Sequence, residues 1–230
     1  MNGDDEGGPL VAVIAAYNEA KAIGPVIAGL LPFVDEVVVV DDGSKDATGQ
    51  VAHARGATVL VHRVNLGQGA ALQTGMLYAL RRGAGLIVTF DADGQHMPTD
   101  IPRMVAMLRT SKADVVLGSR FLGSAEAMPA SKRLLLRAAT LFTRITSGLR
   151  VTDSHNGLRI FTRKAAAAID IRQNRMAHAS EILGEIARLR LSYVEAPVNV
   201  RYTAYSMEKG QRLSGAFEIV FDLISGHYFR

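Results

Sequence analysis

The chain has 230 residues, of which 48% are hydrophobic and 21% charged, so disorder is excluded as its general state and one domain of generous size is expected. It contains no cysteine, which excludes a disulfide scaffold, a thiolate zinc site and a cysteine nucleophile. The net charge of +4, from 26 basic and 22 acidic side chains, suits partners that carry phosphate, and we expect no nucleic-acid partner.

Strands and helices alternate in the first half of the chain. Short apolar runs rich in β-branched residues predict buried strands, and the amphipathic stretches between them predict helices. The predicted strands are 10–16, 37–40, 57–61, 86–90 and 114–117, and the predicted helices are 18–31, 46–55, 67–82 and 99–110. This alternation predicts an α/β fold with right-handed crossovers and a mostly parallel central sheet that carries helices on both faces.

The second half of the chain is less regular. Its predicted elements, in chain order, are a loop (118–130), a helix (131–147), a strand (157–161), a helix (178–189), a strand (192–202), a polar loop (203–211) and a helical stripe (213–224). No linker separates a second domain, so we expect one domain over residues 1–230.

The sequence also bears on the location of the protein. No uncharged apolar run approaches the roughly 18–20 residues that span a bilayer. Residues 1–6 are acidic and lack the basic start and apolar centre of a signal peptide. We therefore expect a cytoplasmic protein.

Acidic and polar residues follow three of the predicted strands, at 17–19, 41–46 and 91–96. Because the carboxyl ends of parallel strands meet at one edge of a sheet, ligands gather there and these turns come close together. Three acidic turns in one place repel each other, and a cation or a ligand with many donors would compensate.

The third of these turns suits a divalent cation. Asp91 and Asp93 are two hard carboxylate ligands with the amide oxygen of Gln95 beside them, and Gly94 allows a sharp bend. Such a set favours Mg²⁺ or Mn²⁺, which fill their shell with water and substrate phosphates. The alternative is a solvated turn without a ligand. The position directly after a buried strand favours the metal site.

Other polar motifs have simpler interpretations. Ser44 or Asp46 could cap the helix that follows them. The segment 65–69 has the glycines of a phosphate loop but matches neither the dinucleotide fingerprint nor a P-loop, so it is interpreted as a turn into a helix. His96 and His155 have no second histidine at zinc-ligand spacing, and we interpret each as a polar loop residue.

Five motifs in this order and spacing resemble the inverting family-2 glycosyltransferases, most closely the dolichol-phosphate mannose synthase and polyprenyl-phosphate glycosyltransferase branch. The resemblance extends over residues 10–209. The motifs are Ala16-Tyr17-Asn18-Glu19, Asp41-Asp42-Gly43-Ser44-Lys45-Asp46, Asn65-Leu66-Gly67, Asp91-Ala92-Asp93-Gly94-Gln95 and Gly118-Ser119-Arg120.

The resemblance implies a GT-A fold with a Rossmann-like nucleotide-binding half. It implies a flexible N-terminus (1–8), a nucleotide-sugar-binding half (9–120) and an acceptor-side half (121–230). The expected donor is GDP-mannose or a UDP-hexose, and the expected cofactor is Mg²⁺ or Mn²⁺.

The resemblance also implies roles for particular residues. Asp91, Asp93 and Gln95 would hold the metal against the diphosphate. Arg120 would contact a phosphate of the donor or acceptor, and Asp93, Arg120 and Asp153 form the expected catalytic set. The segment 153–159 resembles the family's lining of the sugar and acceptor site, and Arg201 and Ser206 resemble its mobile loop over the donor. The loop 203–211 is polar and links a predicted strand to a predicted helix, so we expect it to act as a lid. Donor contacts are expected from Ala15, Tyr17, Glu19, Val40, Asp42, Ala92, Arg201, Ser206 and Lys209.

Two classes of acceptor remain open. A polyprenyl phosphate is already an anion near neutral pH, because its second pKa is about 6, and it would need arginines rather than a base. A hydroxyl acceptor would need a general base, for which Asp153 is the candidate. A sugar-nucleotide nucleotidyltransferase is disfavoured because residues 10–19 contain no glycine, and a non-catalytic nucleotide-binding module has no need for a metal pair.

The helix predicted at 131–147 bears on the acceptor. Arg133, Arg137 and Arg144 fall within about 40° of one another around the helix axis. Next to this stripe lies an apolar face made of Leu134, Leu135, Ala138, Leu141, Phe142 and Ile145. The helix could be an ordinary surface helix with a core-facing side. We predict instead that it faces anionic headgroups or a polyprenyl phosphate, with Arg133 and Arg137 as acceptor-phosphate ligands and the enzyme peripheral to the cytoplasmic leaflet.

Overall fold

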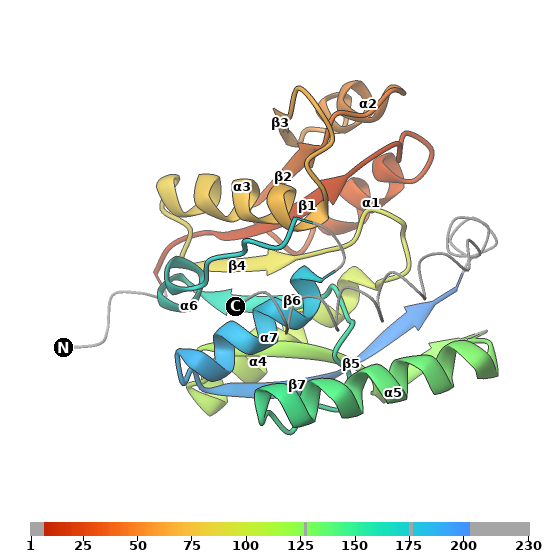
Figure 1. Cartoon of the computed structure of the whole chain (residues 1–230). Helices are drawn as coiled ribbons and strands as arrows, with labels where there is room; N and C mark the ends of the chain where they lie inside the picture. Colours follow the sequence, from red (N-terminus) through yellow and green to blue (C-terminus); the bar gives the residue numbers. More distant parts are fainter. Residues whose placement is uncertain (1–6, 127, 175–176, 203–230) are drawn as a thin grey trace.

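The computed structural model describes residues 7–126, 128–174 and 177–202, which form a central sheet between two layers of helices (Figure 1). The strands are β1 (Leu10–Ala16), β2 (Glu36–Asp41), β3 (Thr58–Val61), β4 (Leu86–Thr89), β5 (Val115–Glu126), β6 (Arg159–Thr162) and β7 (Tyr193–Arg201). The helices are α1 (Ile23–Leu30), α2 (Thr48–Ala54), α3 (Gln68–Arg81), α4 (Ile101–Ser111), α5 (Ala130–Ser147), α6 (Arg163–Ala168) and α7 (His178–Arg188), with a 3₁₀ turn (Pro98–Asp100) before α4.

The seven strands follow the order β3-β2-β1-β4-β6-β5-β7. All neighbours pair in parallel except β6, which runs antiparallel to both β4 and β5. The predicted mostly parallel sheet is therefore confirmed. Its central strands are buried on both faces, which explains why they read as continuous apolar runs.

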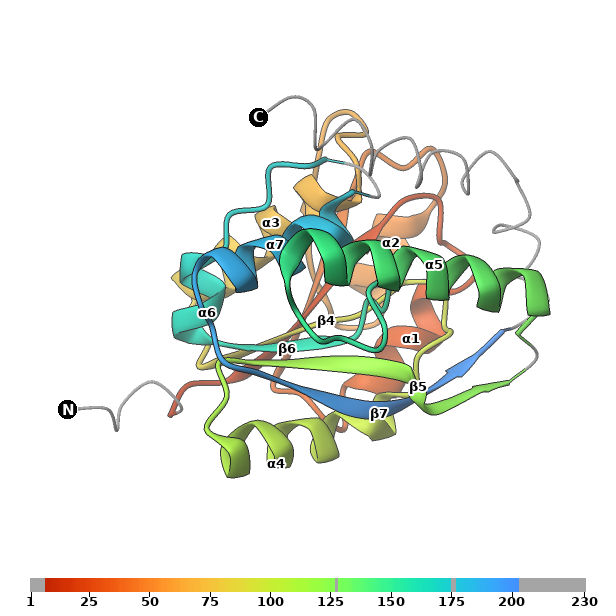
Figure 2. The ribbon, with the colours of Figure 1, turned by 60° about the horizontal axis from the view of Figure 1, so that its bottom comes forward.

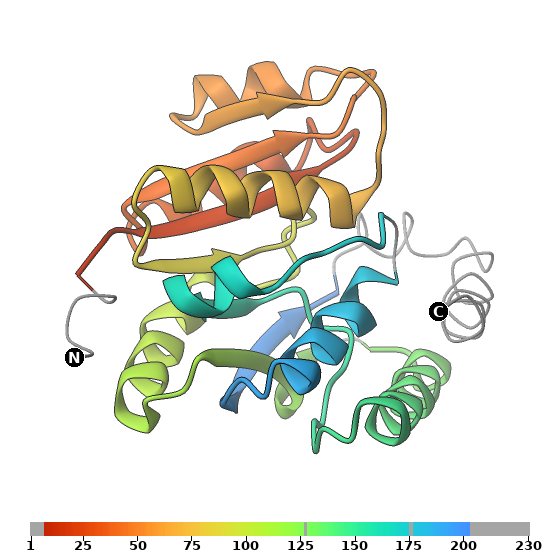
Figure 3. The same ribbon diagram turned by 60° about the vertical axis from the view of Figure 1, so that its left-hand side comes forward.

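The run of four valines in β2 explains how the two helical layers are held. Alternate side chains of a strand point to opposite faces. Val37 and Val39 belong to the apolar core beneath α1, α2 and α4, whereas Val38 belongs to the core beneath α3, α6 and α7. Figure 3 shows α3, α6 and α7 together on the near face of the sheet.

One prediction about the second half is wrong. The segment 118–130, predicted as a loop, continues β5 as far as Glu126, because it pairs with β7 from Ser124 onward after an irregularity that begins at Ser119. Gly123 lies at this irregularity, where an added Cβ would clash with the backbone oxygen of Val198. Pairing with a distant strand therefore overrides the local glycine signal.

Two helices also differ from the prediction. The helix expected from residue 18 begins at Ile23, because Asn18 has a left-handed φ of 54° that a right-handed helix excludes. The short α6, between β6 and the segment that leads to α7, was not predicted.

The topology creates a binding crevice. The chain proceeds outward in the sheet from β1 through β2 to β3. Helix α3 then connects β3 to β4, which lies on the other side of β1. Ligands of open parallel sheets bind at such a reversal, outside the carboxyl ends of the strands. Within the described part of the chain, no helix is both long and apolar enough to cross a membrane.

Candidate active site

A pocket of about 900 Å³ opens at the carboxyl ends of β1 and β4, where the strand order reverses. Its walls also come from the end of β2, the turn before α3, the segment before β6 and the start of α7. The predicted site residues that line it are Ala15, Tyr17, Glu19, Asp42, Asp91, Ala92 and Asp93.

The turns after β1 and β2 interlock instead of repelling each other. The backbone N–H of Asn18 donates to Ser44 Oγ (2.9 Å), and the N–H of Lys45 donates to Asn18 Oδ1 (2.8 Å). The N–H of Glu19 donates to Thr48 Oγ1 (2.8 Å). These bonds hold the walls of the pocket at a fixed spacing.

The acidic run after β2 divides into structural and pocket-facing residues. Asp41 accepts the N–H of Ser44 (2.9 Å), and Asp46 accepts the N–H of Thr48 (3.0 Å) at the start of α2. The N-cap position of α2 is Ala47, which has no side-chain cap bond, so Asp46 acts from one residue earlier, and Ser44 binds Asn18 instead. Asp42 is the member of the run that lines the pocket.

Asp42 is 2% exposed, and the orientation of its carboxylate is set by three hydrogen bonds that come from the chain after β3. One carboxylate oxygen accepts from His62 Nδ1 (2.7 Å) and from the N–H of Leu66 (2.9 Å), and the other accepts from the N–H of Gly67 (2.7 Å). His62 is itself held through Nε2 by Thr74 Oγ1 (3.0 Å). The turn at Asn65–Gly67 thus positions an acidic side chain.

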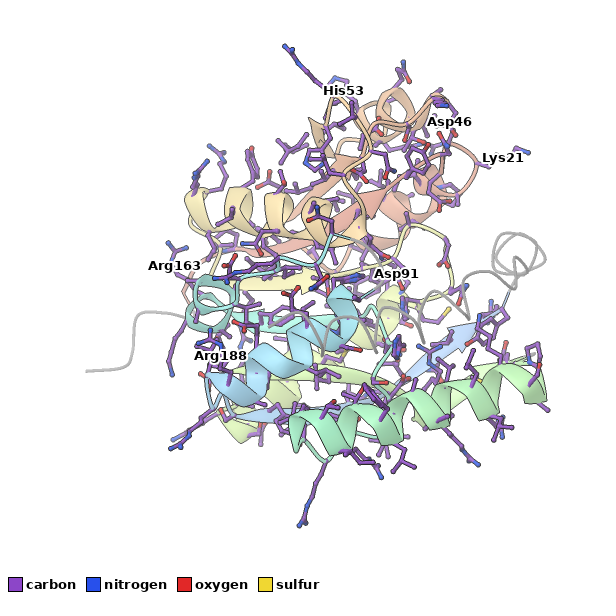
Figure 4. All side chains as sticks on the ribbon, viewed as in Figure 1. Lys21, Asp46, His53, Asp91, Arg163 and Arg188 are labelled. Atoms are coloured by element: carbon purple, nitrogen blue, oxygen red, sulfur yellow. The ribbon has the colours of Figure 1, made fainter. Side chains whose placement is uncertain are left out.

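The carboxylates after β4 are held differently. Asp91 contacts His96 Nε2 (2.9 Å) and packs on Gly157, where an added Cβ would clash with the carboxylate. Asp93 accepts the N–H of Gln95 (3.0 Å) through Oδ1, and within the described residues its Oδ2 accepts no hydrogen bond. Figure 4 labels Asp91 just beyond the end of β4.

These two carboxylates suit a divalent cation. Burial, together with the negative charge of Asp91, raises the pKa of Asp93 to about 6. Burial would also raise the pKa of Asp91, but the hydrogen bond with His96 and the positive charge of Arg159 outweigh it and lower that pKa. Among the described residues there is no cluster of three or more protein ligands. A metal here would therefore take oxygens from two carboxylates and complete its shell with phosphate and water, as Mg²⁺ does.

Arg120 and Asp153 form a buried ion pair beside the pocket, not in its wall. Arg120 Nε donates to Asp153 (2.6 Å), Nη1 donates to Tyr202 Oη (2.8 Å) and Nη2 donates to the carbonyl of His155. The two ion-paired side chains are 6% and 0% exposed. Lys132, on α5, covers the other side of Tyr202 with its ammonium 4.4 Å from the ring centre.

The remaining predicted residues are spread over the molecule. Val40 is buried in the core of β2, Arg201 is largely exposed and pairs with Glu126 (3.1 Å), and Gln95 contributes its backbone N–H to Asp93. Arg133 and Arg137 are exposed on α5. The predicted lid 203–211, with Ser206 and Lys209, lies outside the described residues.

Several polar residues of the site were not singled out by the sequence. His62 directly follows β3, so the same rule of polar residues after strands would have found it. Arg159 ends the segment 153–159 that the family resemblance indicated. Gln68, Asn156 and His178 also line the pocket, and His178 comes from a helix that no local pattern connects to it.

A pocket at a topological reversal, lined by a buried carboxylate and a carboxylate pair, defines a nucleotide-binding α/β enzyme. A model of the family described as Glycosyl transferase family 2 matches residues 11–169. The chain therefore belongs to the family-2 glycosyltransferases, and the predicted likeness to their polyprenyl-phosphate branch is confirmed by its relatives.

Two of these relatives carry functional names. The UDP-N-acetylglucosamine–dolichyl-phosphate N-acetylglucosaminyltransferase of Methanococcus voltae is 32% identical, over 92% of this chain and 93% of that protein. The undecaprenyl-phosphate mannosyltransferase of Micrococcus luteus is 34% identical, over 82% of each.

A solved structure confirms the GT-A architecture. It is glucosyl-3-phosphoglycerate synthase from Mycobacterium tuberculosis in complex with Mn²⁺, UDP and glucosyl-3-phosphoglycerate. The TM-score is 0.71, with 95% of this chain and 80% of that chain covered. At 22% identity this likeness is informative about the fold alone.

Proposed function

We propose that this enzyme transfers a sugar from a nucleoside-diphosphate sugar to a polyprenyl phosphate, with a divalent metal held by Asp91 and Asp93. The observation that carries the proposal is the placing of these two carboxylates in one pocket with Asp42, at the topological reversal. Relatives that cover most of the chain are named for transfer to dolichyl or undecaprenyl phosphate.

The donor would lie across the carboxyl edge of the sheet. Tyr17, Glu19 and Asp42 would contact the nucleoside at β1 and β2, and the diphosphate would lie against Asp91 and Asp93 at β4. A bound Mg²⁺ or Mn²⁺ would supply charge neutralisation for the departing diphosphate. The rigid hydrogen bonding of Asp42 supports a role in orienting the base, because its carboxylate cannot rotate freely.

The acceptor phosphate would attack the anomeric carbon as the bond from that carbon to the diphosphate breaks, and the diphosphate would leave with the electron pair. An ionised phosphate needs no general base. This agrees with Asp153, whose carboxylate is ion-paired with Arg120 and has no exposed surface. A hydroxyl acceptor with Asp153 as its base would require that pair to open.

We further propose that α5 lies on a membrane surface. Leu134, Leu141 and Ile145 are 72%, 58% and 74% exposed, whereas the helix buries Leu136 and the small residues near it. The three predicted arginines of α5 are exposed as well. In Figure 2, α5 runs beside α7 across the front of the molecule, and α4 lies on the other side of β5 and β7. Exposed leucines bordered by arginines match an anionic interface.

The decisive experiment is a transfer assay with GDP-mannose and several UDP-hexoses, a short polyprenyl phosphate and Mn²⁺. We expect one donor to give a solvent-extractable glycosyl lipid and a matching nucleoside diphosphate. Omission of the lipid should leave slow donor hydrolysis.

A parallel reaction with soluble hydroxyl acceptors provides the contrast. Efficient transfer to such an acceptor, with none to the lipid, would overturn the proposed acceptor but retain the donor. An enzyme that neither transfers nor hydrolyses any nucleotide sugar would overturn the whole proposal.

A further inference from the structure

Arg159 is a buried cation that has no hydrogen-bonding partner among the described residues. It begins β6, lines the main pocket and is 3% exposed. Its guanidinium makes no hydrogen bond or ion pair with any described residue. The negative charges nearest to it belong to Asp91 and Asp153, which act on it without a direct contact.

Such an arrangement is unfavourable in the free protein. Burial in low dielectric destabilises a charged side chain unless it is paired and hydrogen-bonded. Burial also lowers the pKa of Arg159 to about 10, which leaves the guanidinium charged at neutral pH. The other buried arginine near the pocket, Arg120, has the opposite situation, with a carboxylate, a tyrosine and a carbonyl as acceptors.

The charged side chains of the pocket wall also indicate that Arg159 has a ligand. Among the described residues that line it there are four carboxylates and one arginine, and no lysine. His155, also in the wall, adds no positive charge, because burial and the charge of Arg159 lower its pKa to about 4. Apart from histidine, the only positively charged side chain that a diphosphate would meet in the described wall of this pocket is Arg159.

The position along the sheet narrows the choice of ligand. β6 lies beyond β4 as counted from β1 and β2, so Arg159 lies on the side of Asp91 away from the expected nucleoside. Groups at this point of the pocket would be the phosphate next to the transferred sugar, or the phosphate that attacks it.

We propose that Arg159 binds a phosphate oxygen at the reaction centre. This inference rests on the proposed function, since it supposes a phosphate on each side of the transferred sugar. The oxygen belongs either to the sugar-linked phosphate of the donor or to the phosphate of the acceptor, and a guanidinium forms two parallel hydrogen bonds with either. Arg159 is thus a substrate-binding residue whose partner arrives with the substrate.

The test compares Arg159→Met and Arg159→Lys with the wild type. Titration calorimetry with Mn²⁺ would measure binding of UDP, GDP and the corresponding monophosphates. If the donor phosphate is the partner, Arg159→Met should weaken diphosphate binding about 10- to 100-fold and leave monophosphate binding nearly unchanged. Arg159→Lys should lose less affinity than Arg159→Met, because lysine keeps the positive charge but lacks the two parallel N–H donors of the guanidinium.

If the acceptor phosphate is the partner, diphosphate binding should be unchanged. The KM for polyprenyl phosphate should then rise by a similar factor, while donor hydrolysis without acceptor stays at the wild-type rate.

Stability separates this binding role from a structural one. Because Arg159 has no partner among the residues that the structure describes, Arg159→Met should leave the Tm unchanged or raise it. Arg163 provides the matched control, since its guanidinium donates to the carbonyls of Leu80 and Ala84 (3.0 Å each), and Figure 4 labels it at α6, away from Asp91. Arg163→Met should lower the Tm and leave nucleotide binding unchanged.

The inference is overturned if both Arg159 variants bind diphosphate and use the acceptor as the wild type does, or if Arg159→Met lowers the Tm as much as Arg163→Met. Failure of the proposed function looks different, because the wild type itself would then bind no nucleoside diphosphate in the presence of Mn²⁺.

Discussion

The acidic side chains at the carboxyl edge of the sheet differ in what holds them, and this difference indicates their roles. Asp42 has both carboxylate oxygens occupied by hydrogen bonds from the protein, and Asp153 is committed to an ion pair. Asp93 has one carboxylate oxygen that accepts no hydrogen bond from the described residues, and its pKa is raised. A carboxylate that is repelled by a neighbouring negative charge is the one whose ionised form a bound cation stabilises most.

Asp93→Asn should abolish transfer and weaken nucleoside-diphosphate binding. The fold should remain intact, because a neutral amide removes the repulsion from Asp91 that raises the pKa of Asp93. Steady-state assays, Mn²⁺-dependent nucleotide titrations and circular dichroism would measure the three properties. Retained activity with unchanged metal dependence would falsify the metal-site assignment.

Asp153→Asn should lower the free energy of unfolding by about 3 kcal/mol, because it leaves the Arg120 guanidinium buried beside a neutral side chain. Urea unfolding followed by circular dichroism would measure it. As a control, Asp170→Asn removes one partner of an exposed ion pair with Arg172 and should change stability by less than about 1 kcal/mol. A stable Asp153→Asn enzyme with a selective loss of hydroxyl-acceptor activity would favour the base role instead.

At the scale of elements, the two sides of the amphipathic helix α5 carry different kinds of side chain. Its buried side is narrow and holds the helix against the molecule, while leucine, isoleucine and arginine side chains remain at the surface. Figure 1 places α5 at the opposite end of the molecule from β3 and α2, so a membrane on α5 would leave the nucleoside end of the pocket in solution.

Arg133→Glu/Arg137→Glu should weaken binding to vesicles rich in anionic lipid about 30-fold or more, since each arginine near such a surface contributes about 1 kcal/mol. Vesicle co-sedimentation at two salt concentrations would measure it. Arg81→Glu/Arg82→Glu makes the same charge change on exposed residues at the end of α3 and should matter less. Equal binding by all three proteins, or no binding by the wild type, contradicts a membrane role for α5.

At the scale of the whole molecule, the pocket is built from segments that span the described chain, from Ala15 to Ala179. A ligand bound there contacts both the β1–β4 half and the β6–α7 half of the fold. Its binding free energy should therefore stabilise the native state as a unit.

UDP or GDP with Mn²⁺, at about 100 times its Kd, should stabilise the fold by about 2.7 kcal/mol. For a domain of this size that raises the Tm by roughly 5–10 °C. Differential scanning fluorimetry would detect the shift, and EDTA should remove most of it. No shift with either nucleotide would favour a protein that does not bind nucleoside diphosphates.

Local patterns alone determined much of this molecule. β-Branched runs such as Val37–Val40 predict strands wherever they are placed, because both faces of the sheet are buried. The acidic turns after β1, β2 and β4 predicted the binding edge, since parallel strands bring their carboxyl ends together. That reasoning brings the turns that contain Asp42, Asp91 and Asp93 to one edge of the sheet, and all three side chains line the pocket.

Contacts between distant segments were decided by tertiary structure alone. The outer part of β5 exists because β7 pairs with it, which overrides the glycines that predicted a loop. In the sequence, Arg120 and Asp153 are indistinguishable from free catalytic groups. They are 33 residues apart along the chain, and folding brings them together as a buried ion pair. The family resemblance indicates the segment 153–159 as a whole, and Arg159 is distinguished within it by its burial without a partner among the described residues. Local sequence records propensity and spacing, but whether a charge is paired depends on what the rest of the chain brings to it.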